Sequence, residues 1–430
     1  MRKKNISLLF FIPMSITLFA QWECPSQLGG NLKQIGESDY SWGAELTGGA
    51  GYLTNSLILN QMSLFGLNYT NNQHTVYLEG GFKTWYQGDY DLKIKSGNIV
   101  PGLREVFYQN NSSLGNLTLG LQSIRSEDVY LVNERVLGLN YKKDFNRIGL
   151  NVFGGTVSNY FARNGTFCNM AYLYDILPYM NQPLLGESLG QTNLAGMTLG
   201  FHPSTKDYEF SDDGLGGEKS RSFLHVETVG LALYSEFGSW IKTPTVMGGV
   251  YSNIEISNGY WLKPELLYSS GASSALIYCA KVEKSVMWQN SYRTVFSASY
   301  YGQTAFNSDN RHSGSKNGED SGEQSGGETK NENKSNNSFS NILAGTVLRF
   351  DTPDMPFYML SVKHTIPKLK AHLKIQYVGQ TKTDPNSEFD IEIGKKFFNK
   401  LVINASYGYV NSPELLSNPN LFRLEMRFNF

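Results

Sequence analysis

In the stretch LFRLEMRFNF, residues 421–430, apolar and polar side chains alternate strictly from Phe422 to the end. Because successive side chains of a β-strand point to opposite faces, this alternation predicts a strand with one apolar face and one largely charged face. The apolar positions are Phe422, Leu424, Met426, Phe428 and Phe430, and the polar positions between them are Arg423, Glu425, Arg427 and Asn429. A strand that meets lipid on one face and a polar lumen on the other is typical of a transmembrane β-barrel.

The same alternation recurs upstream, in KAHLKIQYVG (370–379), NSEFDIEIG (386–394) and LVINASYGY (401–409). A tilted strand needs about 9–11 residues to cross a bilayer, and these runs have that length. About nineteen candidate strands follow one another from residue 42 onward, and 341–350 is one of them. Bacterial single-chain barrels have an even number of strands. We therefore predict an all-β, transmembrane antiparallel β-barrel of about 18 strands, within a range of about 16–20.

The short turns indicate in which part of the chain one of the nineteen candidate strands does not belong to the barrel. Counting forward from the N-terminus, the turns at 71–73 and 144–147 fall on the periplasmic side of the barrel. Counting back from the C-terminus, the turns at 366–369 and 397–400 also fall there. The two counts disagree in the middle of the chain, so the error lies between residues 158 and 350.

The composition excludes two classes of protein. The 430 residues carry 17% charged side chains and a formal net charge of −1, whereas nucleic-acid binding requires a basic patch. The mean hydropathy of −0.33 is too low for a helical membrane protein, but a barrel strand keeps half of its side chains polar. A secreted β-sandwich or propeller with one solvated face per sheet is the alternative.

Cysteines and histidines form no recognisable site in the sequence. The three cysteines, Cys24, Cys168 and Cys279, are too few for a disulfide framework, although a Cys168–Cys279 disulfide can form in an oxidising compartment. The six histidines show no metal-ligand spacing, and no C-x-x-C occurs. We therefore predict no metal site and no cofactor.

The N-terminus has the residue pattern of a secretion signal. Arg2, Lys3 and Lys4 precede the apolar run ISLLFFIPMSITLFA, which is too short for a transmembrane helix. We predict a signal peptide at 1–20, a periplasmic segment at 21–41 and a barrel at 42–430. The predicted location is the outer membrane of a Gram-negative cell, where the protein contacts lipid.

Two long segments interrupt the strand pattern. Residues 158–194 include the apolar stretch MAYLYDILPYM, which either folds into the barrel and narrows it or packs on itself at the rim. Residues 303–340 are predicted to form a disordered loop, because 307–338 contain no aliphatic residue, Phe, Tyr or Trp to bury. The sequence leaves open on which side of the membrane this loop lies.

Enzyme signatures are missing from the sequence. It contains no G-x-S-x-G, no H-E-x-x-H and no phosphate-binding G-x-x-x-x-G-K. The stretch ISNGYW (256–261) shares S-N-G with the outer-membrane phospholipase signature, but Glu255 stands where that signature has its histidine base. We therefore predict that the protein is not an enzyme.

The alternation also predicts which charged side chains face the lumen. The candidates are Arg104, Lys374, Glu388, Asp390, Glu392, Arg423, Glu425 and Arg427. Such a lining either orients dipolar, hydrophilic solutes or forms internal salt bridges without selectivity. The predicted function is a porin-like channel for diffusion or export of small hydrophilic solutes. The alternatives are a non-conducting barrel within a secretion or uptake complex and, less strongly supported, an adhesin or receptor.

Residues 102–155 resemble the alginate-export and related substrate-selective porin families. The resemblance rests on Leu103-Arg104-Glu105, on Leu119-Gly120-Leu121-Gln122 and on Asn133-Glu134-Arg135. It implies an 18-stranded monomeric barrel that exports or admits a polar solute. The mixed charges of the predicted lining differ from the arginine-rich lumen of the alginate exporter. Phe428 and Phe430 resemble the C-terminal signal by which barrel-assembly machinery recognises its clients.

Overall fold

The computed structural model describes most of the strands and short turns of the chain. The described residues are 28, 32–53, 56–88, 94–125, 133–157, 192–203, 224–238, 243–256, 260–271, 274–288, 292–306, 341–343, 349–351, 356–381, 385–398, 400–411 and 420–429. The predicted signal peptide, Cys24, Cys168, Phe430 and most of the two long segments lie outside these residues.

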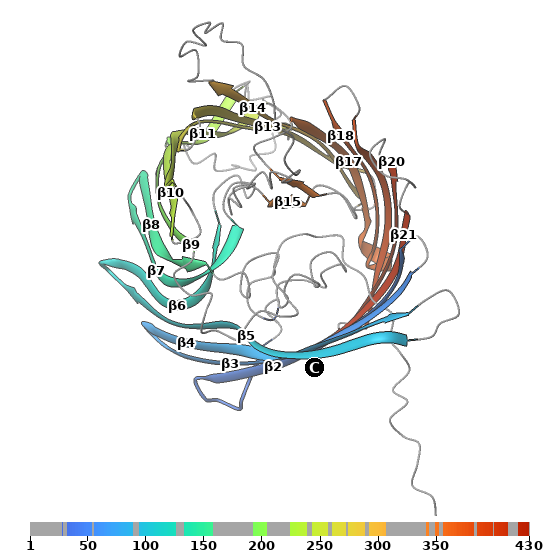
Figure 1. The fold of residues 1–430 in the computed structure, drawn as a ribbon. Coiled ribbons are helices and arrows are strands. Elements are labelled where there is room, and N and C mark those ends of the chain that lie inside the picture. Colours follow the sequence, from blue (N-terminus) through green and yellow to red (C-terminus); the bar gives the residue numbers. More distant parts are fainter. Residues whose placement is uncertain are drawn as a thin grey trace, which may run out of the picture.

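Eighteen strands form a closed antiparallel barrel (Figure 1), as predicted. Each barrel strand pairs with its neighbours along the chain, and β21 pairs with β2 from Glu45↔Asn429 to Leu53↔Leu421 to close the ring. The closing strand β21 is the C-terminal stretch in which apolar and charged side chains alternate. Closure leaves no strand edge unpaired in hydrocarbon, which is the condition for a β-structure to span a membrane.

The barrel strands run in chain order around the ring. Their bounds are β2 (Tyr40–Leu53), β3 (Ser56–Asn71), β4 (His74–Gly88), β5 (Ile94–Ser112), β6 (Gly115–Arg125), β7 (Asn133–Phe145), β8 (Ile148–Val157), β9 (Thr192–Phe201), β10 (Leu224–Phe237), β11 (Thr245–Ile256), β12 (Tyr260–Ser270), β13 (Ser274–Met287), β14 (Arg293–Phe306), β17 (Phe357–Ile366), β18 (Ala371–Gln380), β19 (Ser387–Phe397), β20 (Leu401–Asn411) and β21 (Asn420–Asn429). A two-residue strand, β1 (Lys33–Gln34), pairs only with β2.

One candidate strand was wrong, and it lies in the predicted interval. Residues 341–350 do not join the barrel but contribute to a separate two-stranded sheet of β15 (Asn341–Leu343) and β16 (Arg349–Asp351). Figure 1 shows β15 inside the ring of barrel strands. An alternating pattern predicts a strand but does not say with which sheet the strand pairs, so one candidate barrel strand belongs to another sheet. The barrel also includes Gln303–Phe306, because β14 extends four residues into the predicted loop at 303–340.

The two longest connections of the barrel, 158–191 and 307–356, lie at one end, whereas the other end has short turns and one longer connection, 202–223 between β9 and β10. We call the end that holds the start of β2 and the end of β21 the terminal rim, and the other end the loop rim. The turns at 71–73, 144–147, 366–369 and 397–400 all lie at the terminal rim, on one side as predicted. Asn72 and Asn146 occupy these turns with positive φ angles of 40° and 58°, a conformation that asparagine tolerates well. Residues 158–191 and 307–356 connect strands at the loop rim.

The outer face of the barrel is apolar, and every barrel strand contributes to it. Exposed aliphatic side chains such as Leu231, Leu360 and Ile393 occupy the middle of the strands. Aromatic side chains lie nearer the two rims, as in the aromatic girdles of membrane barrels. At the terminal rim they are Tyr40, Trp42, Tyr108, Phe145, Phe201 and Tyr260, and at the loop rim Phe237, Tyr268, Tyr377, Tyr407, Tyr409 and Phe422. No helix in the described part of the chain is long and apolar enough to cross a membrane.

Candidate functional site: the charged wall of the lumen

The charged side chains predicted to face the lumen lie on the side of the strands opposite the exposed apolar ones. Arg104, Glu388, Asp390, Glu392, Arg423 and Glu425 are buried, and Lys374 and Arg427 are half-buried. Their chain neighbours Leu373, Ile375, Phe389, Ile393 and Phe422 are all exposed. The charged side chains are shielded, whereas their apolar neighbours are exposed. A barrel with a polar interior and a lipid-facing exterior has this arrangement.

The structure adds three carboxylates that the sequence analysis did not select. Glu45 on β2, Glu79 on β4 and Glu105 on β5 are each 3% exposed or less. The sequence pattern could have placed Glu45 on the lumen face, because the apolar residues Trp42, Ala44 and Leu46 lie on the opposite face of the strand. The sequence pattern does not identify Glu79 in the same way. Tyr77 lies on the same buried face as Glu79, so both faces of this strand contain apolar side chains.

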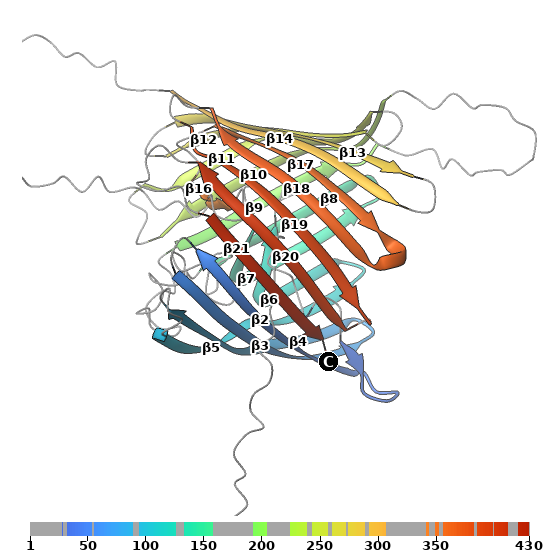
Figure 2. The same ribbon diagram turned by 90° about the vertical axis from the view of Figure 1, so that its right-hand side faces the viewer.

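Together these residues form a charged belt on one wall of the barrel. Its members lie on β18, β19, β21, β2, β4 and β5, which are six of the eight consecutive strands from β18 to β5 across the closing strand pair (Figure 2). We define the charged belt as Lys374, Glu388, Asp390, Glu392, Arg423, Glu425, Arg427, Glu45, Glu79, Arg104 and Glu105. Seven of these side chains are acidic and four are basic, so the belt carries an excess of negative charge.

Ion pairs connect the belt across the closing strands. Arg427 on β21 contacts Glu45 on β2, with Nε 2.9 Å from Oε1, and Thr47 donates a hydrogen bond to the same oxygen at 3.0 Å. Arg423 lies 3.4 Å from Glu425, measured from Nη2 to Oε2. The two arginines of β21 are therefore paired with carboxylates of the same wall.

A β-bulge places Arg104 between two carboxylates. Glu79 on β4 lies opposite Glu105 on β5, and the next register pair is Gly80 with Leu103, so Arg104 is the extra residue of the bulge. The bulge turns two consecutive side chains to the same buried face, where Arg104 forms an ion pair with Glu79. Ser123 on β6 donates a hydrogen bond of 2.6 Å to Glu105. This cluster is a fixed, shielded charge centre on the inner wall.

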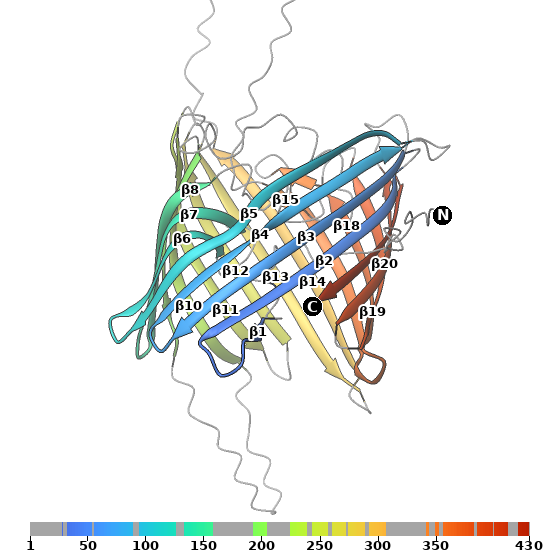
Figure 3. The same cartoon turned by 90° about the horizontal axis from the view of Figure 1, so that it is seen from below.

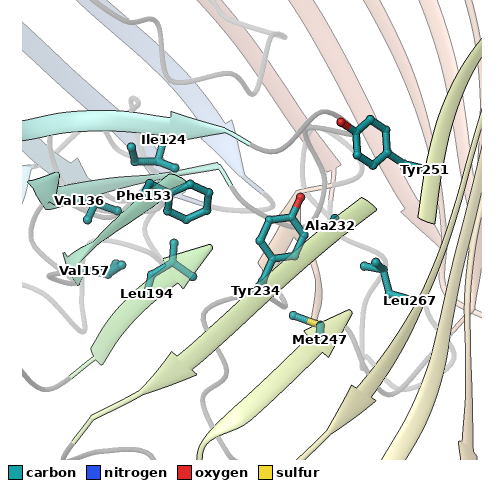
Figure 4. Packing of buried hydrophobic residues seen from close by; sticks show 10 residues of the cluster. All are labelled: Ile124, Val136, Phe153, Val157, Leu194, Ala232, Tyr234, Met247, Tyr251 and Leu267. Carbon is teal, nitrogen blue, oxygen red and sulfur yellow. The ribbon is translucent and has the colours of Figure 1, made fainter. Parts of the chain in front are cut away.

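The opposite wall of the lumen is mainly apolar (Figure 4). Buried side chains from β6 to β12 form one cluster of Ile124, Val136, Phe153, Val157, Leu194, Ala232, Tyr234, Met247, Tyr251 and Leu267. Gly196 makes room for the ring of Phe153, because a Cβ there would lie only 2.3 Å from Phe153 Cζ. Glu236 and Glu265 are the charged side chains among the buried residues of these strands. Apart from the ion pairs of Glu283 with Lys263 and Lys281 on β12 and β13, the barrel interior is thus two-sided, with a charged belt facing an apolar wall.

Comparison with known proteins supports the fold assignment. No protein-family model and no curated protein matches the sequence. Among solved structures, the barrel is similar to the crystal structure of Pseudomonas aeruginosa OpdK with vanillate, with a TM-score of 0.52 and 10% identity over 91% of this chain and 98% of that chain. Acinetobacter baumannii OccAB4 gives a TM-score of 0.52 and 8% identity over 92% of this chain and 99% of that chain.

A third similar structure is that of Pseudomonas aeruginosa OccK5 (OpdH). Its TM-score is 0.51 at 10% identity, and the match covers 91% of this chain and 98% of that chain. At these identities the likeness defines the fold alone. The protein has the closed 18-stranded barrel fold that these outer-membrane proteins share.

Proposed function

We propose that the protein is an outer-membrane channel that passes small hydrophilic solutes. The observation that carries this proposal is the inversion of polarity across the barrel wall, with apolar side chains outside and a charged belt inside. An apolar outer face is stable in lipid, and a charged inner face is stable where ion pairs, hydrogen bonds or water satisfy its charges. The eight predicted side chains would line the pore together with Glu45, Glu79 and Glu105.

The proposal includes the route of the chain to the membrane. Residues 1–20 would direct export and be removed before Gln21, and barrel-assembly machinery would insert the protein, with Phe428 and Phe430 in its recognition signal. Long loops of such barrels are extracellular and short turns are periplasmic. The terminal rim would therefore face the periplasm, and the loop rim with its connections 158–191 and 307–356 would face outward.

The two-sided interior indicates the chemical class of the solute. A molecule with a charged or strongly polar group and an apolar body can contact the charged belt and the apolar wall together. OpdK was crystallised with vanillate, a small molecule of that kind. The resemblance of residues 102–155 to the alginate-export and substrate-selective porin families also supports a polar solute. The predicted ability to orient dipolar solutes fits a lumen whose two walls differ in this way.

Solute flux through the purified protein tests the proposal. Liposomes that contain the folded barrel are expected to swell in isotonic solutions of small sugars, amino acids and aromatic acids, because these solutes enter through the pore and water follows. Planar bilayers with the same protein are expected to show discrete conductance steps. Heat-unfolded protein at the same lipid ratio is the control. Absence of both flux and conductance from a correctly folded sample would refute the channel.

The excess of carboxylates in the belt predicts a preference for cations. Replacing Glu388, Asp390 and Glu392 by Gln, Asn and Gln removes three negative charges from β19 with little change in shape. We expect the cation-to-anion permeability ratio to fall by about fivefold, the effect of roughly 1 kcal/mol of lost attraction. The reversal potential in a KCl gradient measures this ratio. Glu37→Gln, at an exposed site, is the matched control, and equal reversal potentials for all three proteins would contradict the assignment.

A non-conducting barrel is the second candidate, and one observation favours it. The β15–β16 sheet lies inside the ring in Figure 1, so part of the lumen is already occupied. A sealed barrel would act as a structural or interaction component of a secretion or uptake complex. Stable copurification of a partner with a sample that passes no solute would support this function over the channel.

A further inference from the structure

Three neighbouring turns of the terminal rim are strongly basic. They connect β13 to β14, β17 to β18 and β19 to β20, and these six strands follow one another around the ring (Figure 2). In Figure 3, β14 and β19 both reach the lower rim of the barrel, near which β1 lies. The segments 284–293, 364–372 and 395–400 contain seven Lys or Arg residues and no Asp or Glu. We define the basic arc as Lys284, Arg293, Lys368, Lys370, Lys395, Lys396 and Lys400.

The basic arc differs from the rest of the terminal rim, where carboxylates accompany the cations. Asp144 follows Lys143 in the turn between β7 and β8, and Glu37 and Asp39 follow Lys33 between β1 and β2. Six of the seven side chains of the arc are exposed, and Lys284 is half-buried. A surface with charges of one sign attracts ions of the opposite sign much more strongly than a mixed surface does. The arc is therefore an anion-attracting part of the rim.

Two lysines of the arc lie on the lipid-facing side of the wall. Lys284 pairs with Tyr260 across β13 and β12, and its Nζ lies 3.8 Å from the centroid of the exposed Tyr260 ring. Lys395 is two residues from Ile393, which is 55% exposed on the outer face, and its Nζ lies 4.9 Å from the centroid of the Phe397 ring. Ammonium groups beside the aromatic girdle of a barrel lie at the depth of the lipid headgroups.

Large apolar side chains project between the charges of the arc. Met287 is 65% exposed, Trp288 54%, Leu369 56% and Phe398 85%. Phe398 also has a positive φ of 47°, which is uncommon for a bulky aromatic residue. A free anion can interact with the charges alone. A molecule with an anionic headgroup and apolar chains can contact both the lysines and these apolar groups.

Hydrogen bonds connect the three turns to one another. Trp288 donates from Nε1 to Oγ1 of Thr294 at 2.7 Å, and that oxygen lies 2.8 Å from Nδ1 of His364. These contacts join the turn between β13 and β14 to the end of β17. The backbone N–H of Lys396 donates to the carbonyl oxygen of Lys370 at 2.8 Å, which joins the other two turns. The arc is consequently preformed, and binding at it needs little reorganisation.

We propose that the basic arc binds the phosphate group of an anionic phospholipid in the membrane leaflet at the terminal rim. The inference rests on the proposed placement of the barrel in a membrane and not on its conductance. Lys284 and Lys395 contact the phosphate from the lipid-facing side, through charge-assisted hydrogen bonds from their ammonium groups. Trp288 and Phe398 contact the apolar part of the same lipid. The attraction increases with each cation near an anionic membrane surface, so the seven cations act together.

Lipid retained by the purified barrel tests the arc. The folded protein is mixed in detergent with equal amounts of phosphatidylglycerol and phosphatidylcholine, and native mass spectrometry counts the lipids that stay bound. We expect bound phosphatidylglycerol to exceed bound phosphatidylcholine by about tenfold. Replacing Lys368, Lys395 and Lys400 together by Gln should reduce this ratio to about two or less, because three positive charges are lost. Replacing the same three residues by Arg keeps the charge and should keep the ratio.

A second triple variant removes equal charge from the rest of the rim. Lys33→Gln, Lys142→Gln and Arg147→Gln together should leave the lipid ratio within about twofold of the original value, because these residues lie outside the arc. Equal losses in the two Gln variants would overturn the assignment to the arc. Inorganic phosphate in excess should not displace phosphatidylglycerol, since it makes no apolar contact. Complete displacement would overturn the lipid site in favour of a site for free phosphate.

Conductance of the same proteins in phosphatidylcholine bilayers separates this inference from the channel proposal. Both Gln variants are expected to conduct, because the exposed side chains of the arc lie at the rim and not in the charged belt. Normal conductance with equal retention of the two lipids would overturn the lipid site and leave the channel standing. A preference for phosphatidylglycerol in a folded protein that never conducts would support the lipid site and refute the channel.

Discussion

Deletion of residues 420–430 is expected to abolish the assembled barrel. β21 pairs with β20 on one side and with β2 on the other, through nine residue pairs on each side. Without it, the facing edges of β20 and β2 would expose unpaired N–H and C=O groups to hydrocarbon. Each such group costs several kcal/mol, so an open sheet of this kind cannot persist in a bilayer. Heat-modifiable migration of outer-membrane fractions on denaturing gels measures assembly, and we expect no folded band.

A deletion of equal length in a polar loop provides the control. Residues 317–327 lie in the segment that the sequence predicts to be disordered, and their removal should leave the yield of folded barrel unchanged. Phe430→Ser tests the assembly signal separately, because it leaves all register pairs of β21 intact. We expect a lower yield of inserted protein from it, but normal stability of the fraction that inserts. A wild-type amount of folded barrel after deletion of β21 would contradict the closure argument.

The sequence predicted the parts of the fold in which the two faces of a strand differ in chemistry. From Phe422 to Phe428 in β21, apolar and charged side chains alternate without exception, and Arg423 and Glu425 are buried while Phe422 is exposed. In β10 the pattern fails, because Ala232 and Tyr234 face inward while Leu231 and Leu233 face outward. Both faces of such a strand are apolar, so the sequence does not show which one faces lipid. The apolar wall of the lumen was missed for this reason.

Irregular backbone geometry explains the other misses. Alternation predicts that Arg104 and Glu105 point to opposite faces, but the bulge in β5 turns both of them inward. Arg104 was therefore predicted on the lumen side, and its acidic neighbour was not. Leu28 precedes any strand pattern, and its position depends on hydrogen bonds to residues about fifty positions later in the chain. Contacts at that separation leave no periodic signal in a single sequence.

Arg104→Met is expected to destabilise the barrel by about 3–5 kcal/mol, the usual effect of removing one partner from a buried ion pair. Arg104 is 1% exposed and lies where Glu79 and Glu105 oppose each other across β4 and β5. Two facing carboxylates repel each other, and neither is accessible to solvent, so their charges would remain uncompensated after the substitution. Urea-induced unfolding in lipid vesicles, followed by tryptophan fluorescence, measures the free energy of unfolding.

Two further variants distinguish loss of charge compensation from loss of packing. Glu79→Gln combined with Arg104→Met removes one of the two opposed carboxylates, and Ser123 still donates to the remaining Glu105. We expect this double variant to recover most of the lost stability, although methionine replaces arginine in both proteins. Arg293→Met, at an exposed site near the terminal rim, should change stability by less than about 0.5 kcal/mol. If the double variant proved no more stable than Arg104→Met alone, Arg104 would stabilise the barrel through its packing. Compensation of the charges of Glu79 and Glu105 would then not be the reason for the bulge.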